Sequence, residues 1–415
     1  MVVKAEALDA DLSELCTEWL AEGRRNLAAG MHAIVRREDA GLAQALRQSG
    51  GAGLHEPLLY ARLHYGHARA ARQPCLSLSQ IAFGYLDPAL QPGAIGVLAD
   101  VSGRVCLPGV GHLLSEARVR ELRLSTLGEA GAHVLTTPEG VEVPFTLLPP
   151  LACASGRVEI VRHGDPLYSA VFRRDDGSAA GRELGTEVDC QGERYTRVVA
   201  RSFELLREHL GCYYEPMVSV TRQVFVFDEP EVLSFARLSA HGAVFINARG
   251  RSGDESHFVC ELVCRSAVTL LASMIPQPKR CFDVDPYMRL DEHGITWGGD
   301  RNLYTALHGM FYEYLMTRCL EVLHERRVFS GRLAHEVWGR LAFLHSRFRY
   351  DIHELMLHGG VLSERGRELY RPLAAAIHRL REARTRCSGV DLTSQVAAFD
   401  YARFVERNPE PADRL

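Results

Sequence analysis

The amino-acid sequence predicts an α+β protein, with a mixed N-terminal half that contains β-hairpins and a mostly helical C-terminal half. Three observations predict this class. Apolar residues recur at helical spacing near the N-terminus, short β-branched runs alternate with turn signals over 93–185, and long helical patterns follow from 254 onwards. The 415 residues, 47% of them hydrophobic and 24% charged, are enough for two or three globular domains.

The N-terminal half is predicted to contain two helices and two hairpins. Apolar residues at helical spacing indicate helices over 11–35 and 55–72. One hairpin is expected over 134–145, around Pro138-Glu139-Gly140, and a second over 158–172, around His163-Gly164-Asp165-Pro166.

A polar segment with two glycines, 175–181, predicts a domain boundary. It divides the chain into residues 1–180, a mixed α/β recognition domain, and residues 181–415, a mostly helical catalytic-like domain. The second domain is expected to begin with a helix over 192–210. Two strands and two long helices should follow, at Gln223–Phe227, Ala243–Asn247, 254–274 and 300–326.

The charge balance and the N-terminal segment limit the classes of partner. Lys plus Arg number 48 against 52 Asp plus Glu, so the composition predicts no nucleic-acid partner. The N-terminal segment lacks the basic start and apolar run of a signal peptide, and no apolar stretch reaches the ~18 residues of a membrane span. We therefore expect a cytoplasmic protein with no membrane partner, whose 11 cysteines are mostly reduced thiols. The strong excess of arginine over lysine indicates a GC-rich bacterial source.

The helix expected over 254–274 carries the chemistry. It is apolar all round, which is typical of a buried helix, except for one polar stripe of His257, Cys260, Glu261 and Cys264. The spacing of Cys260, Glu261 and Cys264 is that of the H-E-x-x-H metal helix, with cysteine at both histidine positions, so two soft ligands would face one ion. In the alternative, which we favour for this segment taken alone, the cysteines are small buried residues and Glu261 pairs with Arg265.

The next predicted helix offers a third ligand. His308 would complete a Cys₂His site with an open position, and the alternative is a core histidine in a packed helix. Arg301 lies seven residues earlier, roughly 10 Å along the axis. Its guanidinium could hold a carboxylate, and the alternative is a solvated arginine at a helix start.

These residues resemble a known family, the α-ketoglutarate-dependent H-E-x-x-H-type peptide β-hydroxylases of bacterial ribosomal-peptide pathways. The resemblance covers about 190–385. It includes the strand Gly242–Asn247, the motif helix Phe258–Leu271, the series Trp297, Arg301, Leu307-His308-Gly309, and the later Leu362–Gly366. The resemblance implies a zincin-like metal-helix domain with a divalent metal, iron or zinc, on Cys260, Cys264 and His308. It also makes Glu261 the catalytic motif glutamate and Arg301 the residue that holds α-ketoglutarate.

The sequence departs from the family at both motif histidines. Two thiolates favour tetrahedral zinc over a six-coordinate oxygenase iron. His257, one turn before Glu261, is the candidate substitute ligand and would give a His/Glu/Cys set.

Three functions follow from this pattern. The first, narrowly preferred, is an altered metal-dependent hydroxylase that modifies a ribosomally synthesised precursor peptide. The second is a catalytically inactive relative that binds a precursor peptide or another pathway enzyme. The third is a zinc peptide hydrolase with Glu261 as general base. An extended peptide would add as a strand to an exposed sheet edge.

Overall fold

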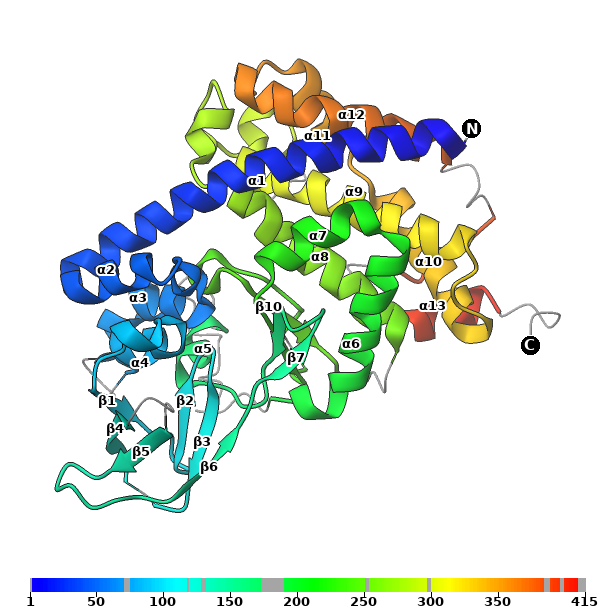
Figure 1. The fold of residues 1–415 in the computed structure, drawn as a ribbon. Coiled ribbons are helices and arrows are strands. Elements are labelled where there is room, and N and C mark those ends of the chain that lie inside the picture. The colour runs from blue at the N-terminus through cyan, green and yellow to red at the C-terminus, as the bar shows by residue number, and fades with distance from the viewer. Residues whose placement is uncertain are drawn as a thin grey trace. The chain divides into compact units, whose positions relative to one another are not determined.

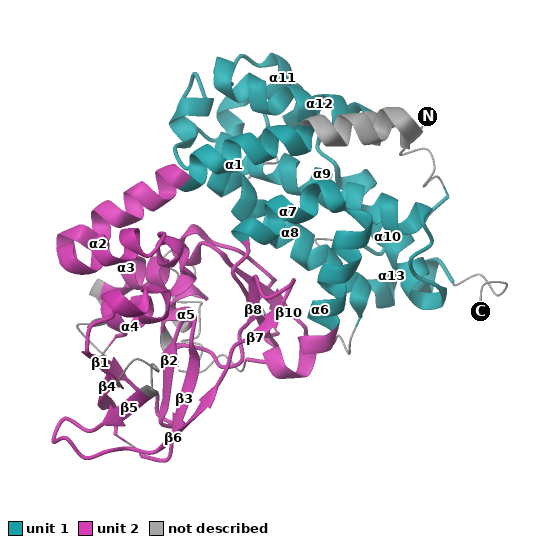
Figure 2. Cartoon of the chain, viewed as in Figure 1, with its two compact units in different colours: residues 1–24, 198–220, 251–415 teal, residues 25–197, 221–250 magenta. Residues whose placement is uncertain are grey.

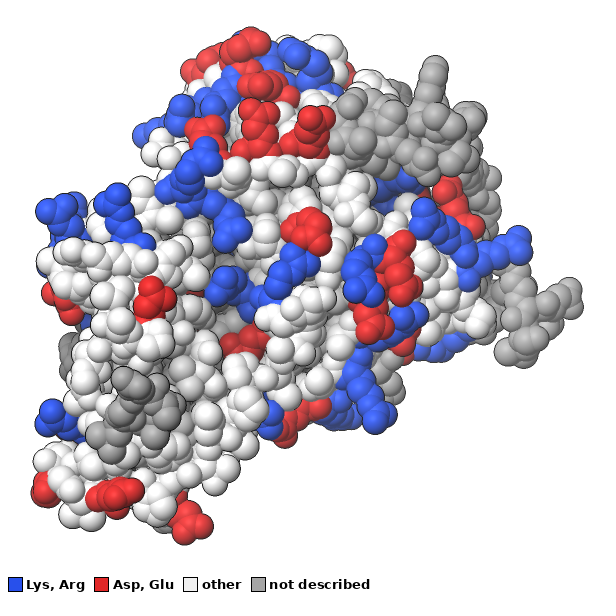
Figure 3. All heavy atoms as spheres, in the orientation of Figure 1, with Lys and Arg blue, Asp and Glu red and all other residues white. Residues whose placement is uncertain are grey.

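The computed structural model describes residues 2–70, 75–117, 119–127, 132–172, 190–230, 232–250, 254–296, 300–383, 389–395 and 399–409. These residues form a mixed structure, with small sheets in the N-terminal half and helices in the C-terminal half (Figure 1). The predicted α+β class is therefore confirmed. Acidic and basic side chains are interspersed over the face shown in Figure 3.

The chain divides into two compact units, neither of which is one continuous stretch (Figure 2). Unit 1 comprises Met1–Arg24, Val198–Val220 and Arg251–Leu415, and unit 2 comprises Arg25–Arg197 and Thr221–Gly250. The segment 175–181, where we predict a domain boundary, lies outside the described residues, so the division at 180 stays a prediction.

Unit 2 contains three small sheets among its described residues. The first is antiparallel with the order β1-β4-β5: β1 (Ala94–Leu98), β4 (Glu121–Leu127) and β5 (Ala132–Thr136). The second is antiparallel with the order β2-β3-β6: β2 (Arg104–Leu107), β3 (Gly111–Ser115) and β6 (Phe145–Leu148). The third has the order β10-β9-β8-β7: β7 (Leu151–Cys153), β8 (Val158–Ile160), β9 (Gln223–Phe227) and β10 (Ala243–Asn247).

The strands β9 and β10 match the two strands predicted for the second half. They are parallel, and all their residues but Asn247 are buried, which agrees with their nearly continuous apolar sequence. Helices and 3₁₀ turns complete unit 2: α2 (Ala40–Gln48), α3 (Pro57–Ala70), α4 (Leu78–Ala82), α5 (Pro166–Val171), η1 (Ala52–His55), η2 (Phe83–Tyr85), η3 (Pro88–Leu90) and η4 (Leu238–Ala240). The helix α3 confirms the helix expected over 55–72.

The two predicted hairpins have different outcomes. Around Gly140 the turn is present, because Thr137 N–H donates to the Val141 carbonyl at 2.8 Å, but β5 and the segment after the turn share only a single bridge, Thr136 with Glu142. The hairpin over 158–172 is wrong. Pro166 begins the helix α5, and the Asp165 carboxylate accepts from Leu167 N–H at 2.7 Å, so Asp-Pro is a helix cap here and not a hairpin turn.

Unit 1 is helical. Its helices are α7 (Gly211–Val220), α8 (Glu255–Met274), α9 (Leu303–Glu325), α10 (Gly331–Arg347), α11 (Tyr350–His358), α12 (Glu364–Ala383) and α13 (Tyr401–Arg407), with 3₁₀ turns η5 (Pro278–Cys281) and η6 (Leu290–His293). Two longer helices, α1 (Val2–Glu38) and α6 (Gly192–His209), contribute residues to both units. The helices α6, α8 and α9 confirm those expected over 192–210, 254–274 and 300–326.

The helix α8 is the centre of unit 1 and packs against α7, α9 and α10. It has the length and composition of a membrane span, yet 83% of its most apolar window is buried inside the structure, which is compatible with the core helix of a soluble protein. Gly23 of α1 permits close approach, because a Cβ there would lie 1.8 Å from the Ser273 carbonyl oxygen of α8.

Candidate functional site

The polar stripe predicted along one face of α8 is largely buried. His257, Cys260 and Cys264 are 8%, 2% and 3% exposed. The side chain of Glu261 is 18% exposed. The helix begins after Asp254 and ends before Pro276, as its sequence predicts.

Glu261 has a partner on its own helix. Arg265 Nε donates to Glu261 Oε2 at 3.0 Å, and Nη2 forms an ion-pair contact with the same oxygen, also at 3.0 Å. Burial raises the pKa of Glu261, but the charges of Arg265 and His257 outweigh it and hold the pKa below its ordinary value. Glu261 is therefore a carboxylate engaged in an i,i+4 ion pair, which is the alternative that the sequence left open.

Cys260 lies in an apolar environment. It packs in a cluster with Leu320 of α9 and Val337 and Leu341 of α10. Burial raises the pKa of Cys260 to about 12 and that of Cys264 to about 11. Both sulfurs are thus protonated thiols at neutral pH when no ion is bound.

His308 packs against a ring of its own helix. Its imidazole lies edge-on to Tyr304, with the ring centroids 4.6 Å apart. Burial lowers the pKa of His308 to about 4, and its Nε2 has no hydrogen-bond partner among the described residues. An orphaned imidazole nitrogen is available for a ligand, but a metal site needs two or three more donors beside it.

The predicted metal ligands are not brought together in the described part of the chain. Across the described part of the chain, no three His, Cys, Asp or Glu side chains lie grouped so that they could hold one. The structure therefore assembles neither the Cys260, Cys264 and His308 set nor the set with His257 in place of a motif histidine.

Electrostatic interactions link some of the predicted site residues of α8 to residues of α9 and the segment before it. Glu261 and Glu313 of α9 both raise the pKa of Cys264, and the charges of Arg301 and Arg265 both act on Tyr312 of α9. We call this group the α8–α9 polar cluster; it consists of Glu261, Cys264, Arg265, Arg301, Tyr312 and Glu313. Cys260 also interacts electrostatically with Glu261 and Cys264 but packs against apolar side chains of α9 and α10, and His308 packs against Tyr304.

Glu313 is a site residue that the sequence prediction missed. Burial raises its pKa to about 7, against the opposing charges of Arg301, Arg347 and Arg349. Its carboxyl makes no hydrogen bond or ion pair with any residue that the structure describes. The available signal was a glutamate in a largely apolar helix, the same signal that identified Glu261.

A second charged network fastens the start of α8 to α10. Glu336 is fully buried and accepts from Arg332 at 3.0 Å and from Arg340 at 2.7 Å. Arg332 also pairs with Asp254, the residue that precedes α8. The charge of Arg340 also opposes burial and lowers the pKa of Cys260, so charged groups of α10 act on the motif helix.

Unit 2 holds a buried carboxyl pair that the sequence prediction also missed. Glu56 accepts from Tyr85 Oη at 2.5 Å and from Gln223 Nε2 at 3.4 Å, and the same Nε2 donates to Glu159 Oε2 at 3.1 Å. Burial, and then the charge of Glu56, raise the pKa of Glu159 to about 7, against the bond from Gln223 and the charge of Arg222. The sequence signal was Gln223, a polar residue at the head of a buried strand.

Two histidines of unit 2 lie beside an arginine. The rings of His112 and His163 are 5.1 Å apart, and Arg104 Nη1 lies 3.1 Å from His163 Nδ1. Burial, followed by the charges of His163 and Arg104, lowers the pKa of His112 to about 4. Arg104 also donates to Asp100 at 2.6 Å. Hydrogen bonds therefore join Asp100, Arg104 and His163, and His112 adds a ring contact; the pKa values of both imidazoles are lowered, chiefly by burial.

Comparison with known proteins adds no relative: no protein-family model matches the chain, and no curated protein sequence is significantly similar to it.

Proposed function

We propose that this chain is a peptide-binding relative of the H-E-x-x-H-type peptide-modification proteins, in which the motif helix is a structural element. The observation that carries the proposal is the Glu261–Arg265 pair, with both contacts at 3.0 Å. A motif glutamate bound in this way is not free to serve as a base. The partner is a precursor peptide or another enzyme of the same pathway.

The α8–α9 polar cluster is the peptide site in this proposal. Arg301 is exposed and has no ion pair among the described residues, unlike Arg349, which pairs with Asp351 at 2.8 Å. Near pH 7 the Glu313 carboxyl is about half protonated, since burial raises its pKa to about 7. The site therefore carries net positive charge and favours carboxylate groups of an acidic peptide.

Fluorescence anisotropy with two synthetic peptides tests this function. One is a labelled decapeptide rich in Asp and Glu, and the other is the same peptide with Asn and Gln in their place. We expect saturable binding of the acidic peptide that weakens about tenfold in Arg301→Gln. Arg371→Gln is the matched control, because Arg371 is exposed on α12 and also has no described partner.

Mass spectrometry separates binding from modification. The bound acidic peptide is incubated with the protein, Fe(II), α-ketoglutarate and oxygen, and its mass should not change. A gain of one oxygen atom that disappears in Glu261→Gln would instead establish the hydroxylase. Equal affinity for both peptides would overturn the acidic-peptide site.

A further inference from the structure

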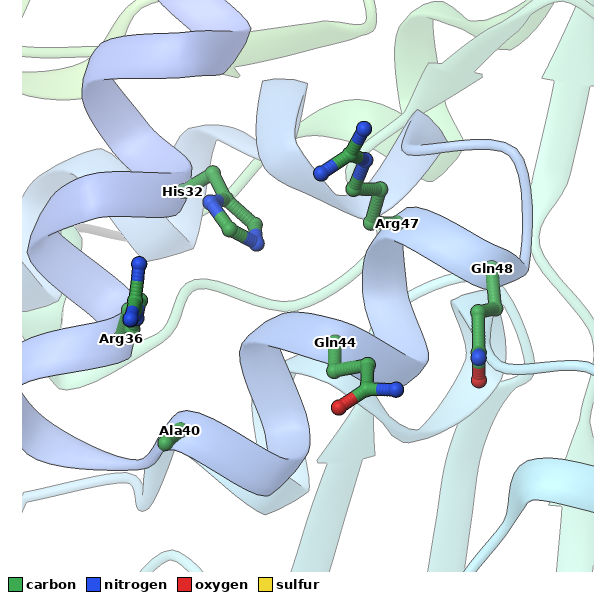
Figure 4. Close-up of a pocket in the computed structure, with 6 residues that line it drawn as sticks. All are labelled: His32, Arg36, Ala40, Gln44, Arg47 and Gln48. Atoms are coloured by element: carbon green, nitrogen blue, oxygen red, sulfur yellow. The ribbon is translucent and has the colours of Figure 1, made fainter.

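A hollow of about 590 Å³ lies where the last turns of α1 meet α2, within unit 2 (Figure 4). Its volume is in the range of small-molecule sites. His32 and Arg36 of α1 line one side. Ala40, Gln44, Arg47 and Gln48 of α2 line the other.

The residues that line the hollow are regularly spaced in the sequence, and this spacing continues from α1 through the break at Asp39 into α2. The lining positions 32, 36, 40, 44 and 48 recur every four residues, which is one face of a helix. Asp39 alone separates the two helices, with φ −150° and ψ 100°, and its carboxylate caps α2 by accepting from Leu42 N–H at 2.9 Å. The opposite faces are anchored in the core of unit 2 by Met31, Val35, Leu42, Ala43 and Leu46.

The hollow is lined by hydrogen-bond donors, and the two arginines among them keep their positive charge. Arg36 and Arg47 make no ion pair with a carboxylate in the described residues. The neighbouring acids are engaged elsewhere, because Asp39 caps α2 and Glu38 lies 3.8 Å from Arg62. Two arginines, a histidine and two glutamines therefore line one hollow, and their positive charge and hydrogen-bond donors match a compact, doubly charged anion.

We propose that this hollow binds the phosphoryl group of a small phosphate monoester. A phosphoryl group presents three oxygens and nearly two negative charges, which two arginines satisfy by two-pronged hydrogen bonding. His32 and the amides of Gln44 and Gln48 supply further donors. The proposal concerns unit 2 and is independent of the peptide site of unit 1.

Calorimetric titration of the full chain with phenyl phosphate and with inorganic phosphate, at constant ionic strength, tests the site. We expect saturable binding of phenyl phosphate that weakens at least tenfold in Arg36→Gln/Arg47→Gln. Arg37→Gln is the matched control, since Arg37 is an exposed neighbour on α1 that does not line the hollow. Circular dichroism verifies that each variant is folded.

The arms of the titration separate the ligand sources. Binding of inorganic phosphate alone would reassign the site to the free anion. If benzoate binds as tightly as phenyl phosphate, the site has no preference for phosphate. The proposal would be overturned if the wild-type chain shows no saturable binding. It would also be overturned if Arg37→Gln loses as much affinity as the double variant.

Discussion

Arg265 lies one helical turn after Glu261, and its Nε and Nη2 atoms both lie 3.0 Å from a single oxygen of the Glu261 carboxylate, Oε2. The two side chains are 23% and 18% exposed, so the pair is largely removed from water. The glutamate of a sequence that resembles a metal-binding motif is therefore engaged in an ion pair inside the helical unit.

The Glu261→Gln substitution should destabilise the fold, because it leaves the charge of Arg265 poorly compensated. We expect a loss of about 2 kcal/mol in the free energy of unfolding, measured with urea. The exposed pair of Arg201 and Glu204, 3.0 Å apart, is the control, and Glu204→Gln should lose less than about 0.5 kcal/mol. An unchanged stability in Glu261→Gln would show that the pair is not formed.

The cysteines of the motif helix should be unreactive in the native chain. Cys260 and Cys264 are buried, and burial raises their pKa values to about 12 and 11. Brief treatment with iodoacetamide at pH 8 should label the exposed Cys212 and spare both. Peptide mass mapping reads the result, and a chelator should not change it. Chelator-dependent labelling of Cys260 would indicate a bound metal.

The Glu56–Glu159 pair should make stability depend on pH. Burial raises the folded-state pKa of Glu159 from 4.5 to about 7, so the native chain holds a proton that the unfolded chain loses over this range. Protonated Glu159 therefore adds to the free energy of unfolding, on the order of 3 kcal/mol at most. This stabilisation is complete below about pH 4.5 and is lost as the pH rises to about 7. Urea unfolding at several pH values should show a flatter profile for Glu159→Gln than for the exposed Glu142→Gln.

Glu313 should make peptide binding depend on pH. Burial raises the pKa of Glu313 to about 7, against the charges of three arginines. The groups that interact with Glu313 electrostatically are Arg301, Arg347, Arg349, Cys264 of α8 and Tyr312 of α9. Deprotonation above this pH adds a negative charge to the site, so the acidic peptide should bind several times more weakly at pH 8 than at pH 6. Anisotropy with Glu313→Gln should show the same affinity at both values. A pH dependence that survives in Glu313→Gln would assign the effect to another group.

The sequence predicts the helices and the buried parallel strands well, because their signals are local. The apolar face of α6 and the continuous apolar runs of β9 and β10 each follow from a short window. The sequence did not predict the helix α5, because the pair Asp165-Pro166 is equally typical of a turn and of the start of a helix. Only the surrounding structure decides between the two.

The site was harder to predict, since ligand geometry depends on tertiary packing. Helical spacing correctly places Cys260, Glu261 and Cys264 on one face, but it cannot tell whether the next helix presents His308 or Leu320 to that face. The Glu56–Glu159 pair joins residues 103 positions apart through Gln223, a relationship that no local pattern contains.

Metal analysis of the anaerobically purified chain tests the central claim most directly. The protein is equilibrated with one equivalent of Fe(II) or Zn(II), desalted and measured by mass spectrometry of the elements. We predict well under 0.1 equivalent per chain, roughly the level of adventitious metal, and the same value for Cys260→Ser and for the buried-cysteine control Cys281→Ser. One equivalent per chain that is lost in Cys260→Ser but kept in Cys281→Ser would contradict the account.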